Sequence, residues 1–504
     1  MIIFGISSGF HDAAITVIAN SNIVFAAHSE RYSKQKNDPF LNREMIAEAL
    51  THGFPEVIVL HEDIELKRQR QQVTGQTILL NEPTQTEWIA QFYPQLNSVP
   101  IKHYSHHDSH AAGGIFTSNF KECAVMVIDA IGEEETATFW RWRDNKLTKE
   151  GSEIYPNSLG LFYSAMTARV GLKPMEDEYI LMGMAGHGDP ARAKELSDKI
   201  GEDLFKNPLP LNNHNPITTK INMHKGLDAG MYNEYSNFDI ASATQHQLQE
   251  RVVAYAKKAK EMAHDSDNLV FMGGCALNCV ANSLLFDAGF KNIHIMPNPG
   301  DAGSSLGCAA MEYYNWTGKS IKWKTPYLGH NIEGDYPIQK ALDSLEKNEI
   351  FGIANGRAEF GPRALGNRSL MADPRGNDIK DTVNAIKHRQ EFRPFAPVIL
   401  AEHVDEYFEM PNGIDSPYMQ FVAKCKHPDK FPAIVHVDGT SRVQTVRPSQ
   451  HPALHELLSK FYEKTGCPML LNTSLNIKGQ PIVNDEGDAA AFAEKYNIPV
   501  HTSD

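Results

Sequence analysis

The chain has 504 residues, of which 41% are hydrophobic and 22% are charged. This composition is typical of a folded globular protein and excludes a disordered one. Lys and Arg total 48 against 62 Asp and Glu, and the net charge of −14 excludes a general basic surface for bulk nucleic acid or an anionic membrane.

The sequence contains no apolar run near the roughly 18 residues that span a membrane, and its start lacks the pattern of a secretion signal. We therefore expect a cytoplasmic protein with no membrane partner. The six cysteines include no C-x-x-C pair, so we predict buried free thiols rather than a disulfide framework or a zinc knuckle.

Taken in order, the first sixty residues predict three short strands, a helix and a fourth strand, at 1–6, 13–19, 23–28, 42–52 and 56–61. The same pattern starts again further along the chain. It comprises strands at 124–129, 136–142 and 146–155 and a helix at 158–171. We interpret the recurrence as an internal duplication of a β-β-β-α-β unit.

After a polar passage around 206–237, helices and strands alternate, at 241–264, 269–272, 276–288, 292–296 and from 304 onward. This alternation predicts a layered α/β domain. Proline-containing segments around 325–337 mark a boundary, beyond which Arg and Lys become concentrated. At about 100–200 residues per domain, we predict two domains, 1–330 and 335–504.

His106 and His110 lie four residues apart in YSHHDSHAAGG, a spacing that puts both imidazoles on one face of a helix. Asp129 ends the strand AVMVID, and Asp301 lies in the glycine-flanked turn PGDAGSSLG. Together they form a candidate site for Fe²⁺, Mn²⁺ or Zn²⁺, among which ligand type alone does not select. The alternative is a chance histidine pair that holds no metal.

Glycine-rich turns follow predicted strands at 5–9 and 273–274 and precede a helix at 300–303. Such turns bind phosphate through backbone N–H groups, although each alone is more often structural. From these turns we take Gly273, Gly274, Asn278 and Gly303 as candidate nucleotide-binding residues. His11 follows the first turn, where it could act as a base on a hydroxyl or serve only as a turn histidine.

The most distinctive run of the second domain is GRAEFGPRALGNRSLMADPR, with Arg357, Arg363, Arg368 and Arg375 among glycines and prolines. Its glycines and prolines disfavour a helix with salt-bridged arginines and favour a pocket for a polyanion. Lys387, Arg389, Arg393 and Arg442 follow it. Asn472 and Ser474 end an apolar strand and could bind a small polar group or cap a turn.

In this order the segments resemble the NodU/CmcH-type O-carbamoyltransferases, which modify nodulation factors and antibiotics. The similarity covers nearly the whole chain. It is carried by GFHDAA, HHDSHAAGG, MVIDAIGE, SLGLFYSA, GGCALNCVAN, PGDAGSSLG, GRAEFGPRALGNRSLMADPR, FRPFAPVIL, VHVDGTSRVQTV and LLNTSLNIKGQPIV. One stretch departs from the family pattern, because Ile180 and Gly186-His187 stand where we expect Lys and Pro-Tyr.

The resemblance implies an N-terminal domain with the duplicated actin/Hsp70/sugar-kinase (ribonuclease H-like) fold and a YrdC-like α/β C-terminal domain. It implies that carbamoyl phosphate and ATP, with Mg²⁺, form a carbamoyl-adenylate in the C-terminal domain. The carbamoyl group then passes to an acceptor hydroxyl in the metal-assisted N-terminal domain. We therefore expect a carbamoyltransferase of class EC 2.1.3.-.

Carried onto this sequence, the family's metal ligands are His106, His110, Asp129 and Asp301, the residues that spacing also nominates. Its activation pocket maps to Arg363, Lys387, Arg393, Arg442 and Ser474, to which we add Asn472. The family's transfer histidine maps to His11.

Two other functions remain open at this stage. One is a small-molecule kinase or ATPase with the same N-terminal fold, and the other is a non-enzymatic regulator with an old nucleotide site. Sequence motifs do not identify the acceptor, which is a hydroxyl-bearing small molecule, a sugar, or a modified nucleoside or nucleotide. A homodimer also remains open.

Overall fold

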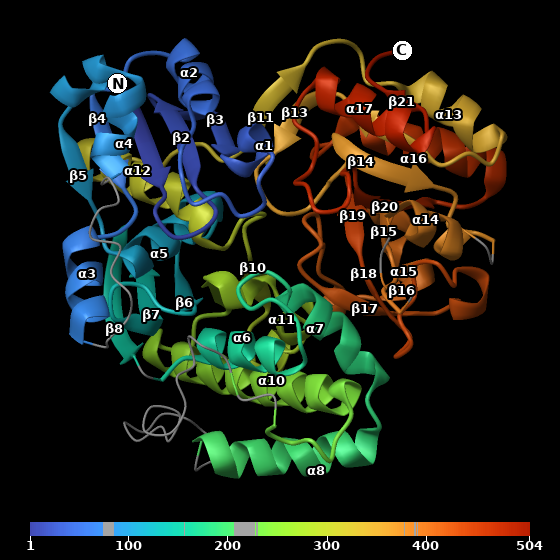
Figure 1. Cartoon of the computed structure of the whole chain (residues 1–504), viewed down its shortest axis with the longest axis horizontal. Helices are drawn as coiled ribbons and strands as arrows, with labels where there is room; N and C mark the ends of the chain where they lie inside the picture. The colour runs from blue at the N-terminus through green and yellow to red at the C-terminus, as the bar shows by residue number, and fades with distance from the viewer. Residues whose placement is uncertain are drawn as a thin grey trace.

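A computed structural model describes residues 1–73, 85–155, 157–205, 227, 230–376, 379–387, 390 and 392–504. The described part is a mixed α/β protein in which two sheets and their helices precede a C-terminal lobe, drawn in orange and red in Figure 1. None of the described helices is long and apolar enough to cross a membrane. All six cysteines are buried and free, as the sequence predicts.

The first sheet has five strands in the spatial order β3-β2-β1-β4-β5. Its strands are β1 (Ile2–Ser7), β2 (Ala14–Ala19), β3 (Asn22–His28), β4 (Val57–Leu60) and β5 (Ile101–His103). Strands β1, β2 and β3 pair antiparallel, whereas β4 pairs parallel with both β1 and β5.

The second sheet repeats this arrangement, with five strands in the order β10-β9-β6-β7-β8. Its strands are β6 (Cys123–Ile128), β7 (Glu135–Arg143), β8 (Lys146–Ile154), β9 (Asn268–Met272) and β10 (Asn292–His294). The first three pair antiparallel, and β9 pairs parallel with both β6 and β10. The predicted repeat of the β-β-β-α-β pattern is therefore confirmed in the strand topology.

Two buried helices, α5 (His106–Thr117) and α12 (Asp301–Thr317), pack against each other and against strands of both sheets. Their approach is close, because a Cβ at Gly307 would lie 1.8 Å from the carbonyl oxygen of Ser109. This contact sets the N-terminal ends of the two helices side by side, which is where the candidate metal ligands lie.

The remaining helices of this half are α1 (Glu30–Ser33), α2 (Arg43–Thr51), α3 (Ile64–Val73), α4 (Gln85–Phe92), α6 (Leu159–Arg169), α7 (Glu178–Met184), α8 (Pro190–Ile200), α10 (Asn237–Met262) and α11 (Cys279–Asn282). Among them, α2 packs on β2 and β3 and α10 packs on β6 and β7, while α8 packs on the outer side of α10 (Figure 1). The long helix α10 starts earlier than predicted, because Ser236 and Asp239 form a capping box there.

The helix predicted at 276–288 is wrong. The chain instead forms a 3₁₀ turn (Gly274–Leu277), the short helix α11 and a second 3₁₀ turn (Leu285–Ala288). Asn278 ends the first turn and caps α11 by accepting a hydrogen bond from the backbone N–H of Ala281. The predicted strand at 292–296 also ends early, at His294, and α12 begins at Asp301 rather than at 304.

The C-terminal lobe contains a six-stranded sheet in the order β19-β15-β20-β14-β12-β21. Its strands are β12 (Phe351–Ala354), β14 (Arg368–Ala372), β15 (Ala396–Leu400), β19 (Gln444–Val446), β20 (Met469–Ser474) and β21 (Val500–His501). A separate three-stranded sheet contains β16 (Phe408–Glu409), β17 (Val422–Cys425) and β18 (Thr440–Arg442).

Helices α13 (Ile338–Glu346), α14 (Ile379–Lys387), α15 (Val404–Tyr407), α16 (Pro452–Thr465) and α17 (Glu486–Tyr496) surround these sheets. The lobe is joined to the first half through β11 (Tyr327–Ile332), which pairs antiparallel with β13 (Gly356–Glu359). The Arg357 guanidinium on β13 also donates to the carbonyl oxygen of Val24 on β3, at 2.6 Å.

Candidate functional site

Helix α5 places two imidazoles at one buried point. It begins at His106, where the Ser105 hydroxyl accepts a hydrogen bond from the Asp108 N–H at 3.2 Å. His110 follows one turn later, so that the Nε2 atoms of His106 and His110 lie 3.1 Å apart. His107 points away, and its Nδ1 lies 3.0 Å from the Thr138 hydroxyl.

Two carboxylates complete this group. Asp129 follows the last residue of β6, and its Oδ2 lies 3.2 Å from the Nε2 of His106 and 3.0 Å from that of His110. Asp301 opens α12, with Oδ1 3.4 Å from both nitrogens. The four side chains, called the metal-ligand group below because they could hold a metal, are buried. Each offers one ligand atom, and these four atoms all lie within 4.8 Å of one another.

The chemistry of this group fits a divalent cation. Burial disfavours a charged His106, but the Asp301 and Asp129 carboxylates outweigh that effect and raise the pKa of His106. The carboxylates therefore favour positive charge at this point, which a divalent cation would supply in place of protons on the imidazoles. Two imidazole nitrogens and two carboxylate oxygens are ligands that suit Fe²⁺, Mn²⁺ or Zn²⁺.

His11 lies beside this group, beyond the end of β1. Its Nδ1 is 3.1 Å from Asp12 Oδ2, and its Nε2 is 3.8 Å from Asp301 Oδ2. Burial opposes the imidazolium, but Asp301, Asp12 and Asp129 outweigh it and raise the pKa of His11 to about 9. His11 is thus held by Asp12 on one nitrogen, while the other faces the metal-ligand group.

The second group of candidates lies in the C-terminal lobe and is cationic. Arg363, Lys387, Arg393 and Arg442 line a common wall with Asn472 and Ser474. Burial, together with the charges of Arg442 and Arg393, lowers the pKa of Arg363 to about 9. Mutual repulsion among buried guanidinium groups is the signature of a pocket built for anions.

Neighbouring residues orient two of these cations. The Lys387 ammonium donates to the carbonyl oxygens of Ser474, at 2.6 Å, and Asn476, at 3.2 Å. The Arg393 guanidinium lies over the ring of Tyr179 at 4.6 Å. Tyr179 belongs to α7 in the first half of the chain, so one wall of the cationic pocket comes from the other lobe.

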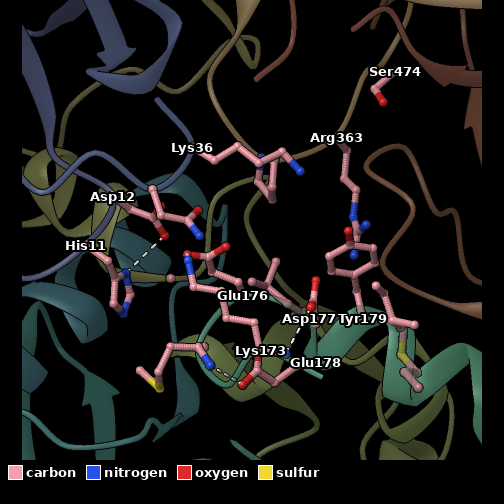
Figure 2. A pocket seen from close by; sticks show the side chains of 18 of the residues that line it. His11, Asp12, Lys36, Lys173, Glu176, Asp177, Glu178, Tyr179, Arg363 and Ser474 are labelled. Atoms are coloured by element: carbon pink, nitrogen blue, oxygen red, sulfur yellow. Dashed lines mark hydrogen bonds and ion pairs between the residues drawn. The ribbon is translucent and has the colours of Figure 1, made fainter. Parts of the chain in front are cut away.

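A cavity of about 940 Å³ is lined by His11, Asp129 and Asp301 as well as by the four cations, whereas His106 and His110 do not line it. Figure 2 shows His11 and Asp12 on one side of this cavity and Arg363 and Ser474 on the other. The segment from Lys173 to Tyr179 lies between the two sides. The structure therefore brings His11, the two carboxylates of the metal-ligand group and the cationic group to one cavity.

Most arginines of the distinctive run do not reach this cavity. Arg368 is fully buried and donates to backbone carbonyls, including those of Asn355 and Asn484. Arg357 likewise donates to backbone carbonyls, and Arg375 pairs with Asp373 at 2.6 Å. Only Arg363 of this run lines the cavity among the described residues. Arg389 lies outside the described residues.

The glycine candidates divide in the same way. Gly274 and Asn278 line the cavity, whereas Gly273 and Gly303 do not. A Cβ at Gly273 would lie 2.2 Å from the Ile128 carbonyl oxygen, and a Cβ at Gly303 would lie 1.8 Å from that of Asn298. Close backbone packing thus accounts for these two glycines without a nucleotide.

The amide and hydroxyl candidates have partners of their own. Asn278 exchanges amide hydrogen bonds with Gln245 at 2.9 and 3.0 Å, in addition to capping α11. The Asn472 amide donates to Gln444 at 2.7 Å, while its Oδ1 has no partner among the described residues. The Ser474 hydroxyl donates to Asn476 at 2.7 Å. Asn472 therefore keeps a free acceptor at the cavity wall.

Sequence reasoning missed two carboxylates near His106. Glu62 follows β4, and its Oε2 lies 3.6 Å from the Nδ1 of His106. Glu133 accepts the backbone N–H of His106 at 3.0 and 3.1 Å. The signal that nominated Asp129, an acidic residue just past a buried strand, also applies to Glu62 in VIVLHED.

The sequence is similar to that of known proteins over most of its length. The sequence model of the family described as Carbamoyltransferase N-terminus matches residues 60–310, and that of Carbamoyltransferase C-terminus matches residues 342–502. A 3'-hydroxymethylcephem-O-carbamoyltransferase from Amycolatopsis lactamdurans is 29% identical, over 97% of this chain and 95% of its own.

Two further relatives are similar over most of the chain. An uncharacterized protein of Synechocystis is 30% identical, over 97% of this chain and 93% of that one. The nodulation protein NolO of Bradyrhizobium diazoefficiens is 34% identical, over 76% of this chain and 75% of that one. Among solved structures, T.kodakarensis HypF aligns with a TM-score of 0.36 at 13% identity, over 63% of this chain and 48% of that chain.

Proposed function

This chain belongs to the carbamoyltransferase family, and from that premise we propose that it is an ATP-dependent O-carbamoyltransferase. One observation carries the proposal: a single cavity is lined both by a cationic wall and by His11 with the metal-ligand carboxylates. Two chemically different ends in one space suit two consecutive steps, activation of a carbamoyl group and its transfer.

Activation takes place at the cationic wall. Carbamoyl phosphate and ATP are both anions and repel each other at reaction distance. Arg363, Arg393, Arg442 and the Lys387 ammonium offset this repulsion, and Asn472 and Ser474 offer hydrogen bonds to polar substrate atoms. Water first hydrolyses carbamoyl phosphate to carbamate and phosphate. A carbamate oxygen then attacks the α-phosphorus of ATP and displaces pyrophosphate, which gives carbamoyl-adenylate. ATP enters with Mg²⁺.

Transfer takes place at the other end of the cavity. A cation held by Asp129 and Asp301 would offset the carboxylate charge that raises the pKa of His11 to about 9. Asp12 holds the Nδ1 of His11, which then leaves an unprotonated Nε2 to take the proton of the acceptor hydroxyl as it attacks the carbamoyl carbon. The divalent cation would be held by the metal-ligand group, His106, His110, Asp129 and Asp301. When bound, it would neutralise phosphate charge on the departing AMP. We take Fe²⁺ first, with Mn²⁺ and Zn²⁺ as alternatives.

The two steps correspond to the two parts of the chain. Residues 1–330 form the transfer domain, with a duplicated sugar-kinase-like fold, and the identical strand order of the two five-stranded sheets supports this assignment. Residues 335–504 form the YrdC-like activation domain, which supplies all four cations. A small-molecule kinase or ATPase that uses only the first domain would not explain the cationic wall of the second domain.

The acceptor is a hydroxyl-bearing small molecule, sugar, or modified nucleoside or nucleotide. One relative is named for a hydroxymethylcephem and another for nodulation. The first of these names supports a small-molecule hydroxyl as the acceptor.

Pyrophosphate release by the purified protein tests the proposal without knowledge of the acceptor. We expect release from ATP and Mg²⁺ that depends on carbamoyl phosphate. Phosphate release from ATP without carbamoyl phosphate would instead indicate a kinase or ATPase. No release from folded protein that binds ATP would indicate a regulator and would contradict the proposal.

A further inference from the structure

A second group of buried polar side chains lies behind His106, on the side of the ring away from Asp129. It contains His61, Glu62 and His106, whose candidate ligand atoms lie within 4.8 Å of one another. Glu62 is only 2% exposed, and its Oε2 lies 3.6 Å from the Nδ1 of His106. Removing a carboxylate from water is costly unless it is paired, so the partners of Glu62 decide what it does.

This group is not a second metal site. The Lys67 ammonium on α3 donates to both Glu62 oxygens, at 2.7 and 3.0 Å. Lys67 is itself largely buried, with 15% of its side chain exposed. The position that a second cation would take beside Glu62 is therefore held by a side chain of the protein.

The two nitrogens of His106 face different partners. Its Nε2 lies among the metal-ligand atoms, 3.2 Å from Asp129 and 3.1 Å from the Nε2 of His110. Its Nδ1 makes no hydrogen bond with the described residues, and the Glu62 Oε2 faces it at 3.6 Å, just beyond hydrogen-bond distance. A carboxylate on one imidazole nitrogen keeps the proton there, leaves the lone pair of the other nitrogen for a metal, and strengthens it as a ligand.

We propose that Glu62, clamped by Lys67, is a positioning residue that fixes the ring and tautomer of His106 so that Nε2 binds the metal. The proposal rests on the metal site of the proposed function. Glu62 does not touch substrate or metal and acts only through His106. Glu133 has a complementary effect on the same residue, because it holds the backbone N–H at the start of α5.

Metal affinity of the full-length, metal-stripped protein tests this inference. We compare Co²⁺ and Mn²⁺ binding by calorimetry, and the visible spectrum of bound Co²⁺, in the wild type and in Glu62→Gln. We expect affinity to fall about 10- to 100-fold and the Co²⁺ spectrum to change. The matched control is Glu65→Gln, which replaces a 73% exposed carboxylate on α3 and should leave affinity unchanged.

A purely structural role for Glu62 would lower the melting temperature of the metal-free protein and leave metal affinity and the Co²⁺ spectrum intact. That result overturns the proposal. If Glu62→Gln does not fold, Lys67→Met takes its place, since it keeps the carboxylate and releases its clamp. For Lys67→Met, a loss of metal affinity smaller than the one expected for Glu62→Gln supports the proposal, and unchanged affinity overturns it.

The failure of this inference is distinguishable from failure of the proposed function. A wild-type protein that binds neither Co²⁺ nor Mn²⁺ overturns the inference together with the metal site. Carbamoyl-phosphate-dependent pyrophosphate release is measured separately and would still support activation.

Discussion

Charge separation within one cavity is the main feature at the scale of single residues. Asp129 and Asp301 concentrate negative charge near His11, whereas burial and neighbouring guanidinium groups lower the pKa of Arg363 to about 9 at the opposite wall. The two ends therefore favour ligands of opposite charge, a cation at the carboxylates and a polyanion at the guanidinium groups.

Replacing Arg363 by Met tests this interpretation of the cationic wall. Removal of one of several repelling charges should leave the melting temperature of the ligand-free protein unchanged or raised. Carbamoyl-phosphate-dependent pyrophosphate release should fall by about 100-fold or more. Arg375→Met is the control from the same run, because Arg375 pairs with Asp373 and does not line the cavity. Full activity of Arg363→Met would refute the assignment of this residue.

His11 should matter for transfer and not for activation. In His11→Ala, pyrophosphate release in the absence of acceptor should stay within about 2-fold of the wild-type rate, because the cationic wall is intact. Carbamoyl transfer to an accepted hydroxyl should fall by roughly 100-fold or more, the usual contribution of a general base. Loss of pyrophosphate release in a folded variant would place His11 in the wrong step.

Helix α7 and the turn that follows it connect the two lobes at the scale of elements. Tyr179 supports Arg393, and the His436 ring nitrogen Nε2 lies 2.9 Å from the Gly183 carbonyl oxygen. His187 packs against Phe392, with 5.5 Å between ring centroids. The stretch in which we expected Lys and Pro-Tyr, at Ile180 and Gly186-His187, therefore contributes to this contact.

Gly186 is the point of closest approach in this contact, since a Cβ there would lie 2.2 Å from Cε1 of His436. We expect Gly186→Ala to displace the His436 ring and lower the free energy of unfolding by about 1–3 kcal/mol. Urea denaturation measures the effect. In the His436→Ala background the same substitution should cost much less, and equal costs in both backgrounds would show that the two sites are uncoupled.

At the scale of the whole molecule, polar contacts join the two lobes. The Arg31 guanidinium donates to the Gly361 carbonyl oxygen at 3.0 Å, and Lys34 pairs with Asp488. Glu48 on α2 also pairs at 2.9 Å with His330 on β11, the strand through which the lobes are joined. The loop that carries Arg363 is thus anchored on the first half of the chain, which fixes the distance between the two ends of the cavity.

The Glu48–His330 pair predicts a pH dependence of stability. The hydrogen bond with Glu48 raises the pKa of His330 above 6.5, although burial opposes it. Burial alone would raise the pKa of Glu48, but the hydrogen bonds that Glu48 makes with His330 and Tyr32 outweigh burial and lower this pKa below 4.5. The His330 contribution is fully present below pH 6.5 and is lost as pH rises through the higher folded value. The Glu48 contribution is present above pH 4.5 and is lost in acid.

Glu48→Gln should therefore destabilise the protein most between pH 4.5 and 6.5 and progressively less above that window. The expected maximum is no more than about 1 kcal/mol, because both side chains are partly exposed and screened by solvent. Denaturation of both proteins across pH 5–9 measures it. A difference that stays constant over this range would contradict the assigned pair.

Local patterns in the sequence were enough to nominate the metal-ligand group. The spacing of His106 and His110 follows from helix periodicity, and Asp129 and Asp301 were nominated by a strand end and a glycine turn. The repeated strand pattern likewise predicted two sheets of one topology. Each of these features depends on residues within a few positions of one another, which is the range over which backbone periodicity is encoded.

Only the tertiary structure decided which side chains serve the cavity. Arg357, Arg363, Arg368 and Arg375 look alike in the local sequence pattern, and only the family resemblance singled out Arg363. In the structure Arg363 lines the cavity, whereas the other three bind backbone carbonyls or Asp373. Gly273 and Gly303 turned out to be required by packing, and Asn278 broke a predicted helix. The shared space between His11 and Arg363 was also invisible in the sequence. The physical reason is that facing a cavity depends on contacts between segments hundreds of residues apart, which no local pattern specifies.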